Sequence, residues 1–224
     1  MMKCKRWLLA VLLMMLPLSA MASDISTISI WKDGAFEDLP VPPPPADPET
    51  IIPGKIHRHA SEAEESLLLR AAILAYFEGA DMDISSLSYA FNEADLDGGE
   101  KEALVLVRGD EIDRSGRPML LIFSKDRDGF REWEELAGMD YPLIIPKRSK
   151  KQESGVHSDL YFLYTDEEGH SSIRRLSPEE GIYPPAVNGE PADEKLLKKL
   201  KGDAWFCSRD KKGREITWFS LGSE

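Results

Sequence analysis

Apolar and polar residues alternate along most of the chain after about residue 85, in short runs separated by glycine and aspartate. This period-two pattern puts successive side chains on opposite faces of a strand, and glycine allows the positive φ of tight turns. Three such turns are DRDG at 126–129, DEEG at 166–169 and DKKG at 210–213. The pattern predicts strands, mostly antiparallel, at residues 87–91, 103–108, 118–123, 130–136, 143–145, 160–165, 171–176, 204–208 and 215–221.

The stretch before these strands has a helical pattern. Ser61 and Glu64 match a capping box, and residues 67–77 supply a broad apolar face that Gly79 can end. A short basic helix is predicted at 195–201, entered through Asp193 and ended by Gly202. The fold class predicted is α+β: mainly an antiparallel sheet or meander, one N-terminal helix (about 61–79) and a short C-terminal helix.

The first 22 residues have a third pattern. Lys3, Lys5 and Arg6 precede the apolar run WLLAVLLMML at 7–16, and the small residues of AMA follow at 20–22. This order is typical of a signal peptide that is cleaved near Ala22. The apolar run is too short for a bilayer, which needs about 20 residues. We therefore expect a periplasmic or secreted protein that does not span the membrane after cleavage.

An extended arm is predicted between the signal peptide and the domain. Its stretch LPVPPPPADP at 39–48 favours polyproline II, so a semi-rigid spacer is expected. The same stretch could instead bind a proline-binding groove, and the apolar residues near 25–31 could add a strand to the domain edge. The predicted organisation is a signal peptide at 1–22, a proline-rich arm at 23–55 and a single globular domain at 56–224.

The net charge of the chain limits the classes of partner that are expected. The chain has a formal net charge of −12, and removal of Lys3, Lys5 and Arg6 with the signal peptide gives −12 − 3 = −15. A chain this acidic repels phosphate backbones and anionic lipids, so no nucleic-acid partner is expected. The acidic charge suits solubility, a basic protein partner or cations.

The exported chain has too few cysteines for an intramolecular disulfide, so its stability must come from a hydrophobic core. Cys4 is lost with the signal peptide, so the exported chain keeps only Cys207 and cannot form an intramolecular disulfide. Cys207 is predicted to be a small buried apolar residue. The alternative is an intermolecular bridge or a reactive thiol.

The most specific internal motif is NEADLDGGEKEALVLV at 92–107. Asp95, Asp97, Glu100 and Glu102 crowd a glycine-bearing loop that leads into a predicted strand. Carboxylates at alternate positions can converge on one hard cation. A weak Ca²⁺ site formed by Asp95, Asp97 and Glu102 is therefore a candidate, and an acidic turn without a metal is the alternative.

The segment DLDGGEKEALVLV resembles the D-x-[DN]-x-D-G-x-x-E loop and strand of exported proteins with FG-GAP-like calcium loops. It also resembles small bacterial periplasmic proteins in which hairpins similar to LLIFSKDRDGFREWEEL follow such a strand. The resemblance implies Asp95, Asp97 and Glu102 as ligands. Here Gly98-Gly99 stands where the family has Gly-Asp-Gly, so one aspartate is missing, and fewer charged oxygens make a weaker site.

Enzyme motifs are absent from the sequence. It has no G-x-S-x-G elbow, no H-E-x-x-H helix and no phosphate-binding glycine loop. His57 and His59 could bind a transition metal, but they have no further ligand at a suitable spacing and are predicted to lie in a solvated linker. The tripeptide Arg108-Gly109-Asp110 is interpreted as ordinary turn chemistry.

The function predicted is that of an exported, non-catalytic envelope protein that binds another protein. Some relatives of the calcium-loop periplasmic proteins inhibit cell-wall hydrolases or act as immunity proteins against them, and the resemblance implies that option. Many such hydrolases are basic, so an acidic binder would gain association rate from charge complementarity. Two alternatives stay open: a carboxylate-based envelope hydrolase, and a structural protein with an acidic calcium loop.

Overall fold

The structure, a computed structural model, describes residues 55–78, 82–112, 117–127, 129–149, 152–166 and 169–222. The chain divides into two compact units, residues 1–41 and 42–224, and every described residue belongs to the second. The predicted signal peptide and the predicted arm, apart from Lys55, lie outside the described residues.

The described part of the chain is mostly β-strand, with few and short helices. The helices are α2 (Leu67–Phe77) and α3 (Glu194–Leu197), with 3-10 turns at Ile84–Ser86 (η2) and Ala186–Asn188 (η3). The strands are β1 (Ile56–Arg58), β2 (Ser88–Ala94), β3 (Glu102–Arg108), β4 (Met119–Asp126), β5 (Gly129–Leu136), β6 (Asp140–Pro146), β7 (Leu160–Thr165), β8 (Ser171–Leu176), β9 (Glu190–Pro191), β10 (Gly202–Trp205) and β11 (Phe219–Ser220).

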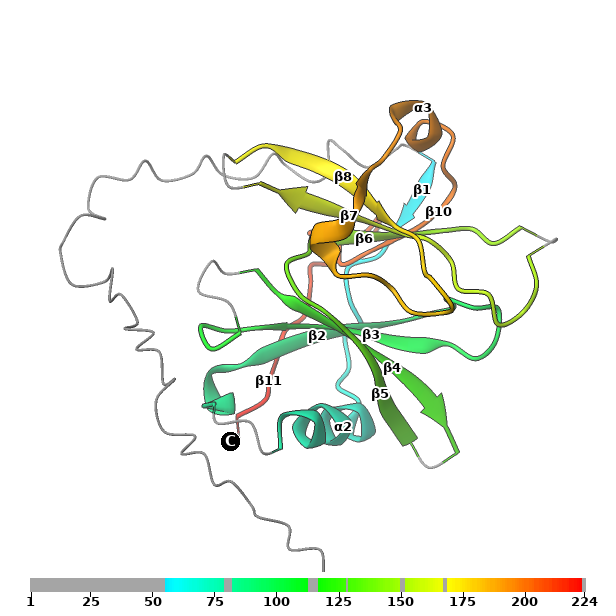
Figure 1. Cartoon of the computed structure of the whole chain (residues 1–224). Coiled ribbons are helices and arrows are strands. Elements are labelled where there is room, and N and C mark those ends of the chain that lie inside the picture. The colour runs from blue at the N-terminus through cyan, green and yellow to red at the C-terminus, as the bar shows by residue number, and fades with distance from the viewer. Residues whose placement is uncertain are drawn as a thin grey trace, which may run out of the picture. The chain divides into compact units, whose positions relative to one another are not determined.

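These strands form two sheets that face each other (Figure 1). The five-stranded sheet has the order β11-β2-β3-β4-β5, and the six-stranded sheet has the order β1-β10-β6-β7-β8-β9. All neighbouring strands are antiparallel except β1 and β10, which pair in parallel. The chain therefore builds most of one sheet, continues into the other, and returns at its C-terminal end to complete both.

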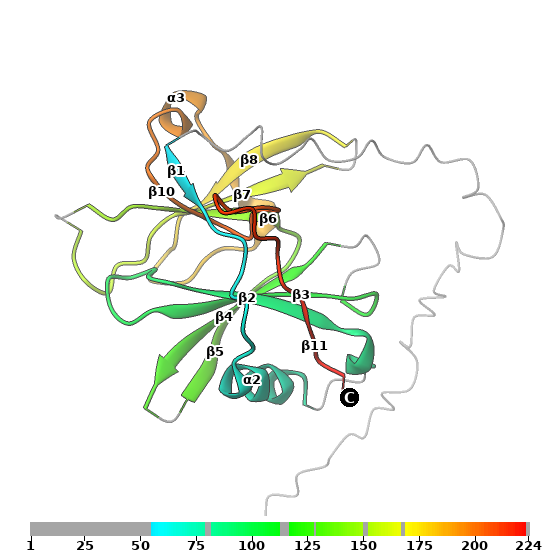
Figure 2. The ribbon, with the colours of Figure 1, turned by 180° about the vertical axis from the view of Figure 1, so that it is seen from behind.

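Two apolar layers lie against the five-stranded sheet. Because successive side chains of a strand point to opposite faces, the run ALVLV in β3 is buried on both sides. One face joins the core between the sheets, which includes Leu104, Leu106, Leu120, Ile122, Leu143, Ile145, Leu160 and Phe162. The other face packs against α2, which lies beneath this sheet in Figure 2, through Leu69, Ile73, Phe77, Val105, Val107, Leu121 and Phe123.

The structure confirms a mostly β fold with antiparallel sheets and few helices. The strands from β2 to β8 lie close to their predicted positions. The strand predicted at 204–208 runs from 202 to 205, that predicted at 215–221 is reduced to 219–220, and β1 and β9 are not among the predicted strands. The meander is divided into two facing sheets. The predicted capping box at Ser61 is wrong, because the helix begins at Leu67 and the side chain of Ser66 accepts the amide of Leu69. The hydroxyl of Ser61 instead accepts the amide of Thr217 at 2.8 Å.

Two short segments also differ from the prediction. The linker predicted around His57 includes β1, which pairs with β10. The C-terminal helix does begin after Asp193, whose side chain accepts the amide of Lys195, but it ends at Leu197. Among the described residues no helix is both long and apolar enough to cross a membrane.

Candidate functional site

The acidic loop between β2 and β3 brings the three predicted metal ligands together. One ligand oxygen each of Asp95, Asp97 and Glu102 lies within 4.8 Å of the others. Asp95 is exposed, Asp97 is partly buried and Glu102 is only 7% exposed. Glu100, the fourth acidic residue of the motif, is exposed and does not belong to the group.

Each of these three carboxylates already accepts an amide of its own loop. Asp95 accepts the amide of Gly98, and Asp97 Oδ1 accepts the amide of Gly99 at 2.7 Å. Glu102 Oε2 accepts the amide of Leu96 at 2.9 Å. Burial is the main reason why the pKa of Glu102 is raised, and the charges of Asp97 and Asp95 raise it further. These hydrogen bonds close the loop around its carboxylates.

Arg148, which follows β6, supplies the loop with a fixed positive charge. Its guanidinium donates to the carbonyl oxygens of Leu96 at 3.0 Å, Val156 at 2.6 Å and Glu153 at 2.7 Å. A Cβ on Gly98 would lie 3.0 Å from the guanidinium nitrogens, so the side chain of Arg148 passes directly under the loop. The amide of Gly155 also donates to Asp97 O at 2.8 Å. Two loops from different sheets are thus joined around one arginine.

Calcium binding by this loop stays a prediction. A site that is filled tenfold above its Kd would add about 1.4 kcal/mol to the free energy of unfolding. We therefore expect excess Ca²⁺ to raise the melting temperature relative to chelator, and Asp97→Asn to abolish the rise while keeping an acceptor for Gly99. Equal melting temperatures in Ca²⁺ and chelator would leave the acidic turn as the correct interpretation.

Glu134 is a buried carboxylic acid that no local pattern in the sequence marks. It lies on β5, is 8% exposed, and its Oε1 accepts the amide of Tyr183 at 2.6 Å. Oε2 is buried and has no hydrogen-bond partner among the described residues. Burial raises the pKa of Glu134 to about 7, and the charge of Glu132 acts in the same direction. Glu134 therefore carries a proton in part of the molecules near neutral pH.

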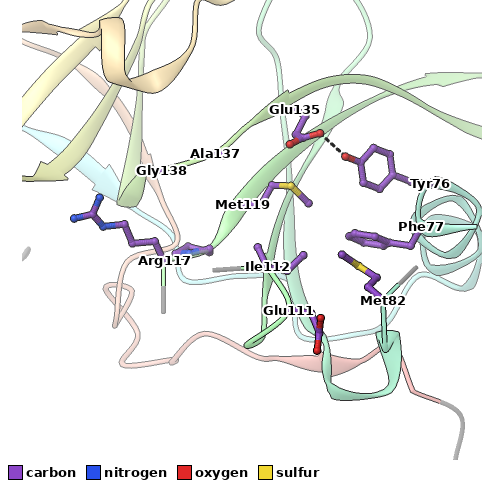
Figure 3. Close-up of a pocket in the computed structure, with 11 residues that line it drawn as sticks. Tyr76, Phe77, Met82, Glu111, Ile112, Arg117, Met119, Glu135, Ala137 and Gly138 are labelled. Carbon is purple, nitrogen blue, oxygen red and sulfur yellow. Dashed lines mark hydrogen bonds between the residues drawn. The ribbon is translucent and has the colours of Figure 1, made fainter. Parts of the chain in front are cut away.

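A hollow of about 490 Å³ lies where α2 ends over the five-stranded sheet (Figure 3). We call it the α2 hollow. Its walls come from segments far apart in the sequence, and include Tyr76, Phe77, Met82, Ile112, Met119 and Glu135. Such a volume falls in the range of about 300–1,000 Å³ that is typical of ligand sites, and mostly apolar walls with few polar groups are also typical.

The polar groups that line the α2 hollow next to α2 are the neutral phenol of Tyr76 and the carboxylate of Glu135. Tyr76 donates its hydroxyl hydrogen to Glu135 Oε2 at 2.5 Å. Burial, followed by this hydrogen bond and the charges of Glu135 and Glu132, raises the pKa of Tyr76 well above its ordinary value. Tyr76 therefore stays protonated, and Glu135 remains its acceptor.

Other candidate residues of the sequence have ordinary structural partners. The thiol of Cys207 is buried and donates to Ala204 O at 3.4 Å, which agrees with the interpretation as a small buried residue. His59 Nε2 lies 2.8 Å from Asp203 Oδ1, whereas His57 Nδ1 lies 3.1 Å from Lys211 Nζ. The two histidines thus contact different neighbours. The guanidinium of Arg108 covers the ring of Trp218 at 3.7 Å.

Comparisons with known proteins give no relative: no family model matches the chain, and neither a curated protein nor a solved structure matches it. The resemblance to proteins with FG-GAP-like loops stays a prediction.

Proposed function

We propose that the protein is an exported, non-catalytic protein of the cell envelope that binds another protein through the α2 hollow. The observation that carries the proposal is an apolar hollow that opens beside carboxylates on the outer side of the five-stranded sheet. Aromatic and methionine side chains are enriched in the cores of protein interfaces, and Tyr76, Phe77, Met82 and Met119 provide this composition.

A basic partner suits this protein, because the exported chain would carry a formal charge of −15, from −12 − 3. Opposite charge raises association rates and makes them sensitive to salt. A cell-wall hydrolase is such a partner, and we propose inhibition of one, or immunity against one, as the biological role. In this proposal the signal peptide delivers the protein to the periplasm or the exterior, where partner and inhibitor meet.

The variant Ile112→Lys tests the binding surface. Ile112 lines the α2 hollow and is only partly buried, so lysine places a charge and a longer side chain at the contact without emptying a core position. We expect the wild-type protein to retain a basic protein from an envelope extract, and Ile112→Lys to weaken the purified complex at least about tenfold, as expected for a central interface residue. Association should slow as salt rises.

Val187→Lys is the matched control. Val187 is an exposed apolar residue of η3, outside the α2 hollow, and its substitution changes the net charge by the same amount. If both variants weaken binding equally, the effect comes from net charge and the α2 hollow is not the surface. If Ile112→Lys binds like the wild type while it stays folded, the proposal is wrong.

A further inference from the structure

The electrostatics of the α2 hollow favour a positive charge. The hollow is lined by the last two residues of α2, where the helix dipole is negative, and the last turn of α2 contains no basic residue. Glu135 lines the same space, and Glu132 is close enough to raise the pKa of Tyr76. Glu111 lines the hollow at a distance from these groups, as Figure 3 shows.

Among the described residues, Arg117 is the basic residue that lines the hollow, and its charge is turned away. Figure 3 shows its side chain directed away from Tyr76 and Phe77. Its Nη2 donates to Thr165 O at 2.7 Å, at the end of β7. The carboxylate of Glu135 therefore has no basic partner among the described residues, because its one hydrogen bond comes from the phenol of Tyr76.

The apolar walls of the α2 hollow determine the second property that a ligand needs, an apolar body. Phe77, Met82, Ile112 and Met119 form the space between Glu135 and Glu111. Methionine side chains are flexible and adapt to an irregular occupant. A ligand that fits must combine an aliphatic body with a cationic end. In proteins, lysine and arginine have this form, since their methylene stems pack on apolar surface while the charge reaches a polar partner.

Resting on the proposed function, we propose that the α2 hollow receives a lysine or arginine side chain of the protein partner. The methylene stem lies against Met82 and Met119, and the cation donates hydrogen bonds to Glu135 and to the hydroxyl oxygen of Tyr76. Because this hydroxyl gives its own hydrogen to Glu135, its oxygen can still accept a hydrogen bond from the cation. The ring faces of Tyr76 and Phe77 add attraction for a cation.

The methionines make the proposal measurable by NMR. Of the eight methionines in the sequence, Met82 and Met119 line the hollow, whereas Met139 is buried in the core between the sheets. The protein, labelled with ¹³C in its methionine methyl groups, is titrated with Nα-acetyl-lysine methylamide. We expect the resonances of Met82 and Met119 to shift and that of Met139 to stay in place, with a Kd on the order of a few millimolar for so small a probe.

Two comparisons separate the charge from the stem. Nα-acetyl-norleucine methylamide has the aliphatic stem without the charge, and should bind at least about threefold more weakly. Glu135→Gln keeps an acceptor for Tyr76 and should weaken the lysine probe about three- to tenfold, whereas Glu100→Gln, an equal change of charge in the acidic loop, should not. Unchanged melting temperatures would show that each variant stays folded.

The outcomes also separate this inference from the proposed function. Equal binding of the lysine and norleucine probes, or no shift of Met82 and Met119, would overturn the basic side chain as occupant. If the partner complex is still weakened by Ile112→Lys in that case, the proposed function stands and the occupant is apolar. If Ile112→Lys is also without effect, both are wrong.

Discussion

Glu134→Gln is expected to raise the free energy of unfolding by about 2 kcal/mol at pH 8. Glu134 is buried, and its pKa is raised from an ordinary 4.5 to about 7, so ionising it in the folded protein costs about 3 kcal/mol at about 1.4 kcal/mol per pKa unit. Glutamine removes this cost and keeps a carbonyl oxygen for the amide of Tyr183. Its amide nitrogen takes the place of Oε2, which has no hydrogen-bond partner among the described residues. An unsatisfied buried donor there costs about 1 kcal/mol, which leaves a net gain of about 2 kcal/mol.

The gain should depend on pH in a defined direction. Because the pKa of Glu134 is higher in the folded state than in the unfolded state, the folded state binds more protons between these two values. The stability contributed by the neutral acid is fully present below 4.5 and is lost as the pH rises through about 7. Urea unfolding of both proteins across this range should show a difference that is smallest in acid and largest at pH 8.

Glu100→Gln is the control for this measurement. Glu100 is exposed in the acidic loop and does not contribute to the raised pKa of Glu134, so the loss of its charge should change the free energy of unfolding by less than about 0.5 kcal/mol. A difference between Glu134→Gln and the wild type that is the same at every pH would show that ionisation of Glu134 is not its cause.

The positions of the strands could be predicted because each strand is a local pattern. The run at 103–108 alternates between two buried faces, and the glycine and aspartate residues beside it mark its turns. The predicted start of the first helix is wrong because the local pattern fits two serines. Both Ser61 and Ser66 can cap a helix. In the structure Ser66 is the cap, whereas Ser61 and Glu62 bond to Thr217 and Phe91, which lie farther along the sequence.

The arrangement of the strands in two sheets could not be read from local patterns. β1 pairs with β10 across more than half of the described chain, and β11 returns to pair with β2. Nothing in a three-residue strand such as β1 specifies its partner, because pairing depends on the rest of the core being in place.

The acidic loop and the α2 hollow also differ in how far the sequence alone could predict them. Asp95, Asp97 and Glu102 fall within one short loop, so the sequence could predict that the structure brings them together. Tyr76, Ile112 and Glu135 meet only because α2 packs across the five-stranded sheet. Glu134 likewise becomes a buried acid only when the segment of Tyr183 covers it. Its neighbour Glu135, one residue later, faces Tyr76 on the other side of the sheet.

Gly202 is needed at its position for a different reason from the one that the sequence suggests. The sequence predicts it as the end of a helix, whereas in the structure it begins β10, between β1 and β6. It pairs with Ile56 on one side and Pro146 on the other. A Cβ on Gly202 would lie 2.1 Å from Ile145 O and 2.9 Å from Pro146 Cα, and both of these are backbone atoms. No rotation of a side chain can relieve such contacts.

Gly202→Ala is therefore expected to lower the free energy of unfolding by at least about 3 kcal/mol, because β6 must move away from β10 to admit one methyl group. For a chain of this size, that corresponds to a fall in melting temperature of about 6–12 °C. Gly213→Ala is the control. Gly213 has a φ of +77°, and no atom of the described residues lies within 4 Å of its Cβ position, so alanine there should cost only about 1–2 kcal/mol of backbone strain. Equal losses in the two variants would mean that β10 and β6 do not approach as closely as the structure requires. A larger loss at Gly202 would show that the six-stranded sheet depends on this close approach, which a pattern of apolar and polar residues does not encode.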